Sequence, residues 1–571
     1  MLMSSLLSCQ AYPLTKRFDA AARHPAQAQQ RLLQALLARH QNTAFGKAHG
    51  FRQISTPQDY RRAVPIHDYE ALRPYVQQMM QGKAGVLVSD PVEMFTLTSG
   101  TTGQSKYIPV TAFSAAQNAR LVRQWLYRLL RDHPRCLSGS IVGVVSPAIE
   151  GYTDSGIPYG SLSGRIYQEM PWLLRRTYAV PYPVFEIKDY EARYWAISRF
   201  AMARDVSFLC TPNPSTLLRL AGVMADHTES LLRSIHNGDL GHIRHALSSA
   251  QQDKLRSYLR PQPRRAHWLE AQLQQLSDIR HLRPQDCWPQ IQSIGCWTGG
   301  SVGVQAQKLA PAYGPVPIRD IGYLASEARV TLPMADGLSS GVLDLTLNYC
   351  EFIPEEATPE DITEENDLPI YLSHELEKGR RYSILLTTPG GLYRYHINDI
   401  VEVTGFYHRA PLLAFVRKGK DMSSLTGEKL HVDQIQAGML QVQRQFKLAV
   451  DAYQWVADIE NMSYRVYLEW SDRRGDDWIQ QTLLPELDQA LRTLNGEYAQ
   501  KRASRRLLPL RCYRMRPGWA EAIKRGVISA GGRDVQYKWP LLCSQISQNP
   551  ITVAYQQAML PQAEAADSFS C

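Results

Sequence analysis

Residues 98–106 read Thr98-Ser99-Gly100-Thr101-Thr102-Gly103-Gln104-Ser105-Lys106, a segment rich in hydroxyl groups and glycine. Its two glycines let the backbone turn so that successive N–H groups face one point, which hydroxyl groups and a lysine surround. Such a loop can hold a polyphosphate through backbone dipoles and charge-assisted hydrogen bonds. It is not a Walker A loop, because the lysine stands three residues after the second glycine. Taken alone, the segment also fits a plain loop between a strand and a helix.

Two further motifs lie downstream of this loop. Residues 323–327 read Tyr323-Leu324-Ala325-Ser326-Glu327 and place an aromatic ring, a hydroxyl and a carboxylate close together. An aromatic ring can stack on a base and a carboxylate can hold Mg²⁺. Taken alone, however, the pentad favours a partly buried tyrosine beside a solvated glutamate. Asp399 ends a strand-like segment, where a carboxylate can accept both ribose hydroxyls or can serve as a turn residue.

The pattern of apolar residues predicts an α/β protein. The first ninety residues favour helices, one of them starting at Asp68, and a short strand at residues 94–97 precedes the hydroxyl-rich loop. A helix is expected after the loop, and strand and helix signals then alternate to about residue 297. From residue 342 strands dominate, with expected strands at 342–347, 383–387 and 400–404, and beyond residue 420 the pattern turns α+β.

Composition restricts the class of protein. The chain has 571 residues, enough for roughly two to four domains, and its 63 basic and 54 acidic residues give a net charge of +9. A surplus of this size predicts no nucleic-acid partner. Nine scattered cysteines show neither metal-ligand spacing nor a disulfide framework, and no apolar run reaches the roughly 20 residues of a membrane helix. We therefore expect a soluble cytoplasmic protein with reduced thiols and no membrane partner.

The three motifs, in this order, are similar to those of the adenylate-forming enzymes, which include acyl-CoA synthetases, nonribosomal adenylation domains and luciferase. In finer detail the chain resembles a bacterial-type member of the auxin-responsive Gretchen Hagen acyl-acid amido synthetases. Segments that carry this resemblance extend over nearly the whole chain: residues 64–65, 68–70, 297–301, 323–327, 351–354, 392–395, 403–406 and 536–540.

The resemblance implies roles for the residues of the loop and the pentad. Glu327 would ligate Mg²⁺ and thereby take part in catalysis, and Ser326 would contact the α-phosphate. The ATP phosphates would be held by Ser99, Thr101, Thr102 and Lys106.

The resemblance also implies a nucleoside site and two catalytic lysines. Tyr323 would stack on adenine, and Asp399 would bind the ribose hydroxyls with help from Arg417. Lys429 and Lys538 match two lysines of the C-terminal domain that act near the α-phosphate. In place of the glycine that usually precedes the aspartate the chain has Asn398, a residue that tolerates left-handed backbone.

The implied architecture is a large N-terminal adenylation domain over residues 1–417 and a smaller mobile α+β domain over residues 418–571. The large domain would combine layered α/β sheets with a β-rich subdomain, and the protein is expected to be a monomer. The implied reaction uses ATP and Mg²⁺ to adenylate a small carboxylic acid and then transfers the acyl group to an amine, for which an amino acid is expected. Two alternatives are a ligase that uses coenzyme A, an alcohol or a carrier protein as acceptor, and a catalytically silent nucleotide-binding protein.

Overall fold

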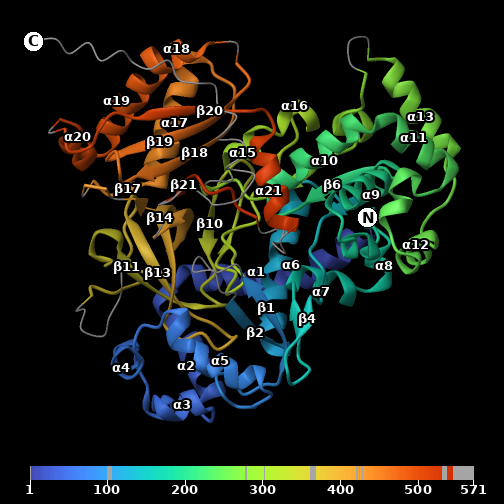
Figure 1. The fold of residues 1–571 in the computed structure, drawn as a ribbon. Helices are drawn as coiled ribbons and strands as arrows, with labels where there is room; N and C mark the ends of the chain where they lie inside the picture. Colours follow the sequence, from blue (N-terminus) through green and yellow to red (C-terminus); the bar gives the residue numbers. More distant parts are fainter. Residues whose placement is uncertain are drawn as a thin grey trace, which may run out of the picture. The chain divides into compact units, whose positions relative to one another are not determined.

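The chain folds as two compact units, one ending at Lys418 and the other beginning at Gly419 (Figure 1). The computed structural model describes residues 2–98, 106–276, 280–300, 303–359, 368–419, 422–423, 425–426, 428–472, 474–503, 505–529 and 537–543. The first unit is α/β with a β-rich part, and the second is α+β, as the sequence predicts.

Helices form the beginning of the first unit, in agreement with the prediction. Leu33, Leu36 and Leu37 recur at helical spacing and are buried. Asp68 caps the helix predicted to begin there, because its carboxylate accepts the Ala71 N–H at 2.8 Å. The helices are α1 (Leu2–Arg23), α2 (Pro25–His40), α3 (Ala44–Ala48), α4 (Pro57–Ala63) and α5 (Tyr69–Met80).

Two buried histidines make the stability of this region depend on pH. Burial lowers the pKa of both His40 and His67 from 6.5 to about 4. The unfolded chain therefore binds more protons than the folded chain between these values, so stability is complete above pH 6.5 and falls as the pH drops toward 4. Each histidine accounts for about 1.4 kcal/mol of unfolding free energy per pH unit in this window.

We expect His40→Gln to flatten this dependence, because glutamine does not titrate. Thermal unfolding temperatures measured from pH 7 to pH 4.5 should fall less in His40→Gln than in the unchanged protein. The exposed His245 supplies the control, since His245→Gln should retain the full dependence. A parallel decline in all three proteins would contradict the assignment.

The hydroxyl-rich loop joins two antiparallel strands, β1 (Val92–Thr98) and β2 (Lys106–Thr111). The helix expected after the loop is α6 (Ala112–Asp132), and a strand that was not foreseen precedes it, because residues 106–111 pair with β1. Thr111 begins that helix by accepting the Ser114 N–H at 3.2 Å. The four-stranded sheet has the order β2-β1-β5-β4, with β4 (Gly151–Tyr152) and β5 (Pro158–Gly160).

A parallel sheet forms the α/β layer. Its strands are β3 (Ser140–Gly143), β6 (Val206–Cys210), β7 (Ser293–Gly295) and β8 (Ile318–Arg319), in that order across the sheet. Their carboxyl ends consequently lie at one edge, where α/β sheets bind ligands. The intervening helices are α7 (Leu162–Glu169), α8 (Trp172–Arg175), α9 (Tyr190–Met202), α10 (Pro214–Asp226), α11 (Thr228–Asn237), α12 (Ser249–Arg256), α13 (Pro263–Gln274), α14 (Pro284–Cys287), α15 (Gly303–Gln307) and α16 (Ala310–Tyr313).

A seven-stranded antiparallel sheet forms the β-rich part, in the order β12-β11-β13-β14-β15-β10-β9. The strand expected at residues 342–347 ends at Leu343, because the Asp344 side chain accepts the Thr346 N–H at 2.8 Å and turns the chain. The strands are β9 (Thr331–Leu332), β10 (Ser340–Leu343), β11 (Tyr349–Pro354), β12 (Tyr371–Leu372), β13 (Arg381–Thr387), β14 (Tyr395–Tyr407) and β15 (Ala410–Lys418).

The second unit packs helices against a mixed sheet of order β20-β19-β18-β21. Its core includes Trp455, Leu468, Leu487 and Leu491, all nearly inaccessible. The strands are β16 (Met422–Ser423), β17 (Leu430–His431), β18 (Val450–Asp458), β19 (Ser463–Trp470), β20 (Arg511–Met515) and β21 (Leu542–Cys543). The helices are α17 (Val432–Phe446), α18 (Asp476–Trp478), α19 (Leu484–Leu494), α20 (Gly496–Ala503) and α21 (Trp519–Ser529).

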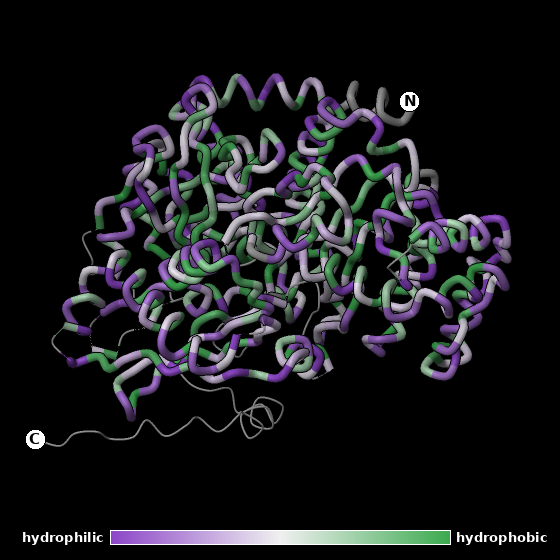
Figure 2. The backbone as a smooth tube through the Cα atoms, turned by 90° about the horizontal axis from the view of Figure 1, so that it is seen from above, coloured by the Kyte–Doolittle hydropathy of each residue, from purple (hydrophilic) through white to green (hydrophobic). Residues whose placement is uncertain are grey.

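None of the helices in the described ranges combines the length and the hydrophobicity that crossing a membrane requires. Figure 2 shows hydrophilic residues along the helices as well as hydrophobic ones. The seven cysteines whose side chains the structure describes are free thiols, five of them buried.

Candidate functional site

The predicted pentad forms a tight turn that holds Ser326 and Glu327 at its tip. The Ala325 N–H donates to the Ala328 carbonyl at 2.8 Å, and Leu324 and Arg329 form an antiparallel bridge beneath it. This pairing fixes the backbone on both sides of the tip. The two polar side chains are thereby presented from a closed and well-defined loop.

Asp320 anchors the start of this turn. Its buried carboxylate accepts the Thr298 N–H at 2.6 Å, the Thr298 hydroxyl at 2.7 Å and the Gly322 N–H at 2.6 Å. Burial raises the pKa of Asp320, and the three hydrogen bonds oppose this rise. The turn requires glycine at position 322, where φ is +89° and an added Cβ would lie 2.5 Å from the Thr331 carbonyl oxygen. Asp320 is a positioning residue that the sequence analysis missed.

The proposed adenine and ribose residues contact one another directly. The Tyr323 hydroxyl donates to Asp399 Oδ2 at 2.5 Å, and the other carboxylate oxygen pairs with the Lys418 ammonium group. Burial and the Asp399 carboxylate raise the pKa of Tyr323, which keeps its hydroxyl protonated as a donor. Both carboxylate oxygens are therefore already oriented by the protein.

The backbone immediately before Asp399 is left-handed, as expected from the asparagine at position 398. Asn398 has a φ of +61°, the left-handed conformation that asparagine tolerates and that the usual glycine would adopt. Asp399 then pairs with Lys418 across β14 and β15, so the two side chains are direct cross-strand partners. Lys418 was not foreseen, because only the strand register reveals this pair.

Lys106 lies in the same cluster of charges. Its ammonium group donates to the Tyr395 hydroxyl at 3.3 Å and lies over the Tyr69 ring, 5.5 Å from the centroid. Burial lowers the pKa of Lys106, and the Glu327 carboxylate opposes that effect. Lys106 and Glu327, distant in sequence, thus come within electrostatic reach of each other.

Glu327 meets the requirements of a magnesium ligand. Among the described residues its carboxylate has no hydrogen bond or ion pair, so both oxygens are available. The described ranges hold no group of three or more His, Cys, Asp or Glu side chains that could bind a metal alone. Mg²⁺ commonly binds through one or two carboxylates together with substrate phosphates and water, so a single glutamate fits this ion.

Of the remaining residues predicted for the nucleotide site in the first unit, the structure describes Arg417 but not the residues of the phosphate loop. Arg417 is buried in β15 and pairs with Glu355, while its Nη1 donates to the Lys418 carbonyl at 2.9 Å. The phosphate-loop residues Ser99, Thr101 and Thr102 lie outside the described residues. Their proposed contacts, like that of Arg417 with ribose, stay predictions.

The two predicted lysines of the second unit are both exposed. Lys429 has a φ of +44° and follows the buried Glu428, which accepts the Leu425 N–H at 2.8 Å and the Thr426 N–H at 2.7 Å and also bonds to the Tyr464 hydroxyl. Burial opposes ionisation of Glu428, but these hydrogen bonds keep its pKa below the usual range. Glu428 therefore holds the segment that presents Lys429.

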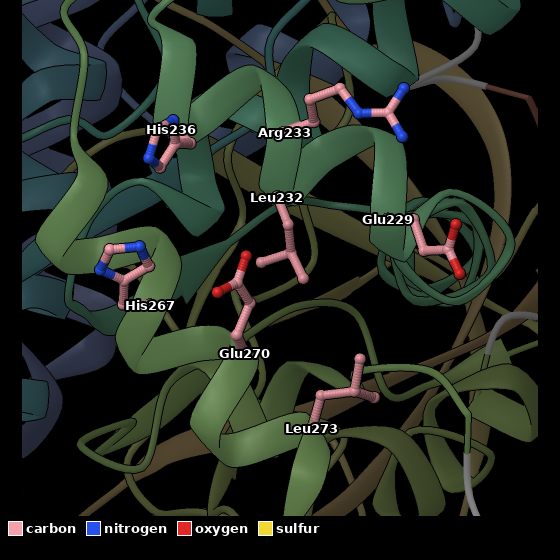
Figure 3. A pocket seen from close by; sticks show the side chains of 7 residues that line it. All are labelled: Glu229, Leu232, Arg233, His236, His267, Glu270 and Leu273. Atoms are coloured by element: carbon pink, nitrogen blue, oxygen red, sulfur yellow. The ribbon is translucent and has the colours of Figure 1, made fainter.

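A separate surface pocket of about 490 Å³ lies between α11 and α13 (Figure 3). Its rim mixes acidic, basic and imidazole groups, and the His236 and His267 rings lie 5.6 Å apart. It contains none of the predicted site residues, and we assign no chemistry to it. The lining residues are Glu229, Leu232, Arg233, His236, His267, Glu270 and Leu273.

Most of the chain matches one protein family, domain by domain. Residues 14–318 match the GH3 family N-terminal domain, residues 341–418 the GH3 family central domain, and residues 433–546 the GH3 family C-terminal domain. The three matches follow one another in the order of the family.

Among full-length relatives, a probable indole-3-acetic acid-amido synthetase GH3.2 of Oryza sativa subsp. japonica is 24% identical over 570 residues. That alignment covers 92% of this chain and 88% of the relative. The indole-3-acetic acid-amido synthetase GH3.3 of Arabidopsis thaliana is 23% identical over 541 residues, covering 90% of this chain and 88% of the relative.

Two solved structures share the fold. The GH3.15 acyl acid amido synthetase superposes with a TM-score of 0.82 at 18% identity and covers 96% of both chains. A 2-hydroxyisobutyryl-CoA ligase in the postadenylation state superposes with a TM-score of 0.53 at 12% identity, covering 94% of this chain and 92% of the ligase. At these identities the likeness shows that the chain has the fold of an adenylate-forming ligase.

Proposed function

This chain belongs to the GH3 family and is an adenylate-forming ligase, an acyl-acid amido synthetase, and from this we propose how its own residues carry out the two steps of the reaction. In the first, an oxygen of the acid carboxylate attacks the α-phosphorus of ATP, forming an acyl-adenylate and releasing pyrophosphate. In the second, the amine of an amino acid attacks the acyl carbon, and AMP leaves. No covalent enzyme nucleophile is required, because the adenylate is already activated.

The observation that carries this proposal is the convergence of Lys106, Tyr323, Glu327 and Asp399 in the first unit. These residues come from three separate motifs, yet Tyr323 bonds Asp399, and the Glu327 and Asp399 carboxylates both act on Lys106. We propose that Asp399 accepts the ribose hydroxyls and that Tyr323 packs on adenine. Lys106, Ser99, Thr101 and Thr102 would bind the phosphates, whose charge suits donors preorganised in this way.

We propose that Glu327 holds Mg²⁺ through its unpaired carboxylate and that Ser326 contacts the α-phosphate from the same turn. When bound, Mg²⁺ would offset the negative charge on the phosphate oxygens. Lys429 and Lys538 would place positive charge near the α-phosphate, and Arg417 would assist at the ribose. Each of these assignments rests on family motifs together with the exposure or orientation of the side chain in its own unit.

The relatives define the class of substrate to test. Two are named for indole-3-acetic acid, and one related structure holds GH3.15 in complex with 2,4-DB. We propose that this chain likewise takes a small carboxylic acid with an apolar body and joins it to an amino acid.

ATP–pyrophosphate exchange across a panel of carboxylic acids tests the first step directly. We expect exchange to require both an acid and Mg²⁺, and we expect amide products when amino acids are added. Coenzyme A supplied in parallel tests the other acceptor class. Thioester formed in place of amide would refute the proposed acceptor, and absence of exchange with every acid would refute adenylation.

Asp399→Ala should weaken ATP binding about a hundredfold or more, since two hydrogen bonds to a charged acceptor are lost, each worth roughly 1.5–3 kcal/mol. Calorimetric titration with ATP measures the effect. Glu402→Ala is the matched control, because Glu402 is a carboxylate of the same strand that pairs with Arg381 at the surface. Equal ATP affinity in both variants would make Asp399 a turn residue and not a nucleotide ligand.

A further inference from the structure

Among the described residues, the guanidinium group of Arg329, close to the proposed site, has no anion to balance it. Arg329 lies two residues after Glu327, at the base of the same turn, and is partly buried. Within the described ranges, its side chain makes neither a hydrogen bond nor an ion pair. Its backbone, in contrast, is fixed, because the Asn348 side-chain amide donates to the Arg329 carbonyl at 2.6 Å.

Carboxylates neutralise several other buried arginines of the first unit, whereas the buried Arg199 hydrogen-bonds, among the described residues, only to Ser234. Arg319 pairs with Asp132 at 2.7 Å and Asp336 at 2.6 Å, Arg394 pairs with Glu351 at 2.9 Å, and Arg417 pairs with Glu355. A charge removed from water without a partner is costly, and proteins usually compensate it. Arg329 differs from these arginines because its side chain has neither a carboxylate nor a hydrogen-bond acceptor among the described residues, so its guanidinium group is available to an anionic ligand.

The titratable group that acts on Arg329 does not supply a balancing negative charge. This group is Cys210, at the carboxyl end of β6, and burial raises the pKa of its thiol to about 11. Tyr178, which in turn interacts with Cys210, has a pKa raised by burial and is also neutral near pH 7. Both groups are uncharged at physiological pH, so Arg329 keeps an unbalanced positive charge.

Arg329 is within electrostatic reach of Cys210, which lies at the edge where a parallel sheet binds ligands. Cys210 ends β6 between Gly143, which ends β3, and Gly295, which ends β7, so the carboxyl ends of three parallel strands surround this point. The Tyr178 ring and the Cys210 sulfur approach these glycines so closely that added Cβ atoms would lie 2.8 Å and 3.3 Å away. At this edge, the backbone of two glycines therefore lies against the Tyr178 ring and the Cys210 thiol.

Partly buried apolar side chains adjoin the same edge. Tyr178, Cys210, Ile321 and Ala325 pack against the main core and yet remain partly exposed. Such a lining suits the apolar body of an acyl substrate. The charged groups that act on Lys106 are Asp68, Glu327, Asp399 and Lys418, and Arg329 is not among them.

We propose that Arg329 binds a second anionic group of the acid substrate, at the end remote from the reacting carboxylate. The preferred substrates would then be dicarboxylic acids, or acids that carry another anion, on an apolar body. This inference rests on the proposed function for its reaction, but it concerns the choice of acid. An arginine offers the planar pair of donors that a carboxylate accepts.

Calorimetric binding of matched acids, measured without nucleotide, tests the proposal. The pairs are phenylacetate with 1,4-phenylenediacetate and hexanoate with adipate, which differ within each pair by the second carboxylate. We expect the unchanged protein to bind the dicarboxylate about tenfold or more tightly than its partner, a difference that salt should reduce. Equal affinity within both pairs would overturn the proposal, whatever any variant does.

Substitutions of Arg329 test whether this residue binds the second carboxylate. Arg329→Met should lower dicarboxylate affinity about 10- to 100-fold while leaving the monocarboxylate within about twofold, and Arg329→Lys should retain part of the preference. Arg264→Met, at an exposed arginine of α13, is the control and should change neither affinity. Equal loss of both acids in Arg329→Met would assign the guanidinium to the reacting carboxylate and overturn the proposal.

ATP–pyrophosphate exchange with the same acids tests the proposed adenylation reaction separately from the proposed anion subsite at Arg329. If no acid supports exchange but dicarboxylate binding still depends on Arg329, the subsite stands and the proposed function fails. If monocarboxylates and dicarboxylates support exchange equally and Arg329→Met alters neither, the function stands and the subsite fails.

Discussion

Glu327→Gln is expected to lower the rate of acid adenylation by about 10²-fold or more without unfolding the protein. The change keeps the shape of the side chain but removes the charge that Mg²⁺ requires, and loss of one preorganised electrostatic group at a reacting phosphate typically has an effect of this size. Stability should be unchanged, because the carboxylate has no hydrogen bond or ion pair among the described residues whose loss would leave a buried partner.

Pyrophosphate exchange measured against Mg²⁺ concentration separates a metal ligand from a structural residue. The variant should need more Mg²⁺ for half-maximal rate, whereas a structural role would lower the rate at every concentration equally. Glu377→Gln removes an exposed carboxylate of the first unit and should behave as the unchanged protein. Unaltered exchange in Glu327→Gln would exclude the residue from the metal site.

Lys429→Ala is expected to lower adenylate formation by roughly 10²-fold, because a positive charge near the α-phosphate stabilises the transition state more than the ground state. Rapid-quench measurement of the two half-reactions shows which of them loses rate. Lys538→Ala, measured in the same way, should lower one or both half-reactions as well.

Lys447 provides a close match for the control of this experiment. It is also an exposed lysine of the second unit with left-handed backbone, φ +53° against +44° at Lys429. Replacement by alanine should therefore change backbone strain similarly at both positions, while only Lys429→Ala affects catalysis. Equal rates in the two variants would show that Lys429 plays no part in adenylation.

Much of the fold was predictable from local patterns. The helices of the first ninety residues, the strands expected at 383–387 and 400–404, which lie within β13 and β14, and the left-handed Asn398 follow from apolar periodicity, capping residues and side-chain sterics, which act over a few residues. The strand β2 was missed, because residues 106–111 become a strand only by pairing with β1. The early end of β10 was missed for a related reason, since the Asp344 side chain turns the chain locally against a β-prone pattern.

By itself, the sequence determined the family, the order of the motifs and the residue types available for ATP, because motifs are local strings whose chemistry can be recognised without coordinates. Only the tertiary structure joined Lys418 to Asp399, Asp320 to Thr298, and Lys106 to Glu327 and Tyr395. Only the structure, too, brought Arg329 within electrostatic reach of Cys210 and showed no anion beside it among the described residues. Strand register and sheet order decide such pairs, and both are set by packing between separate segments of the chain, about which no local pattern carries information.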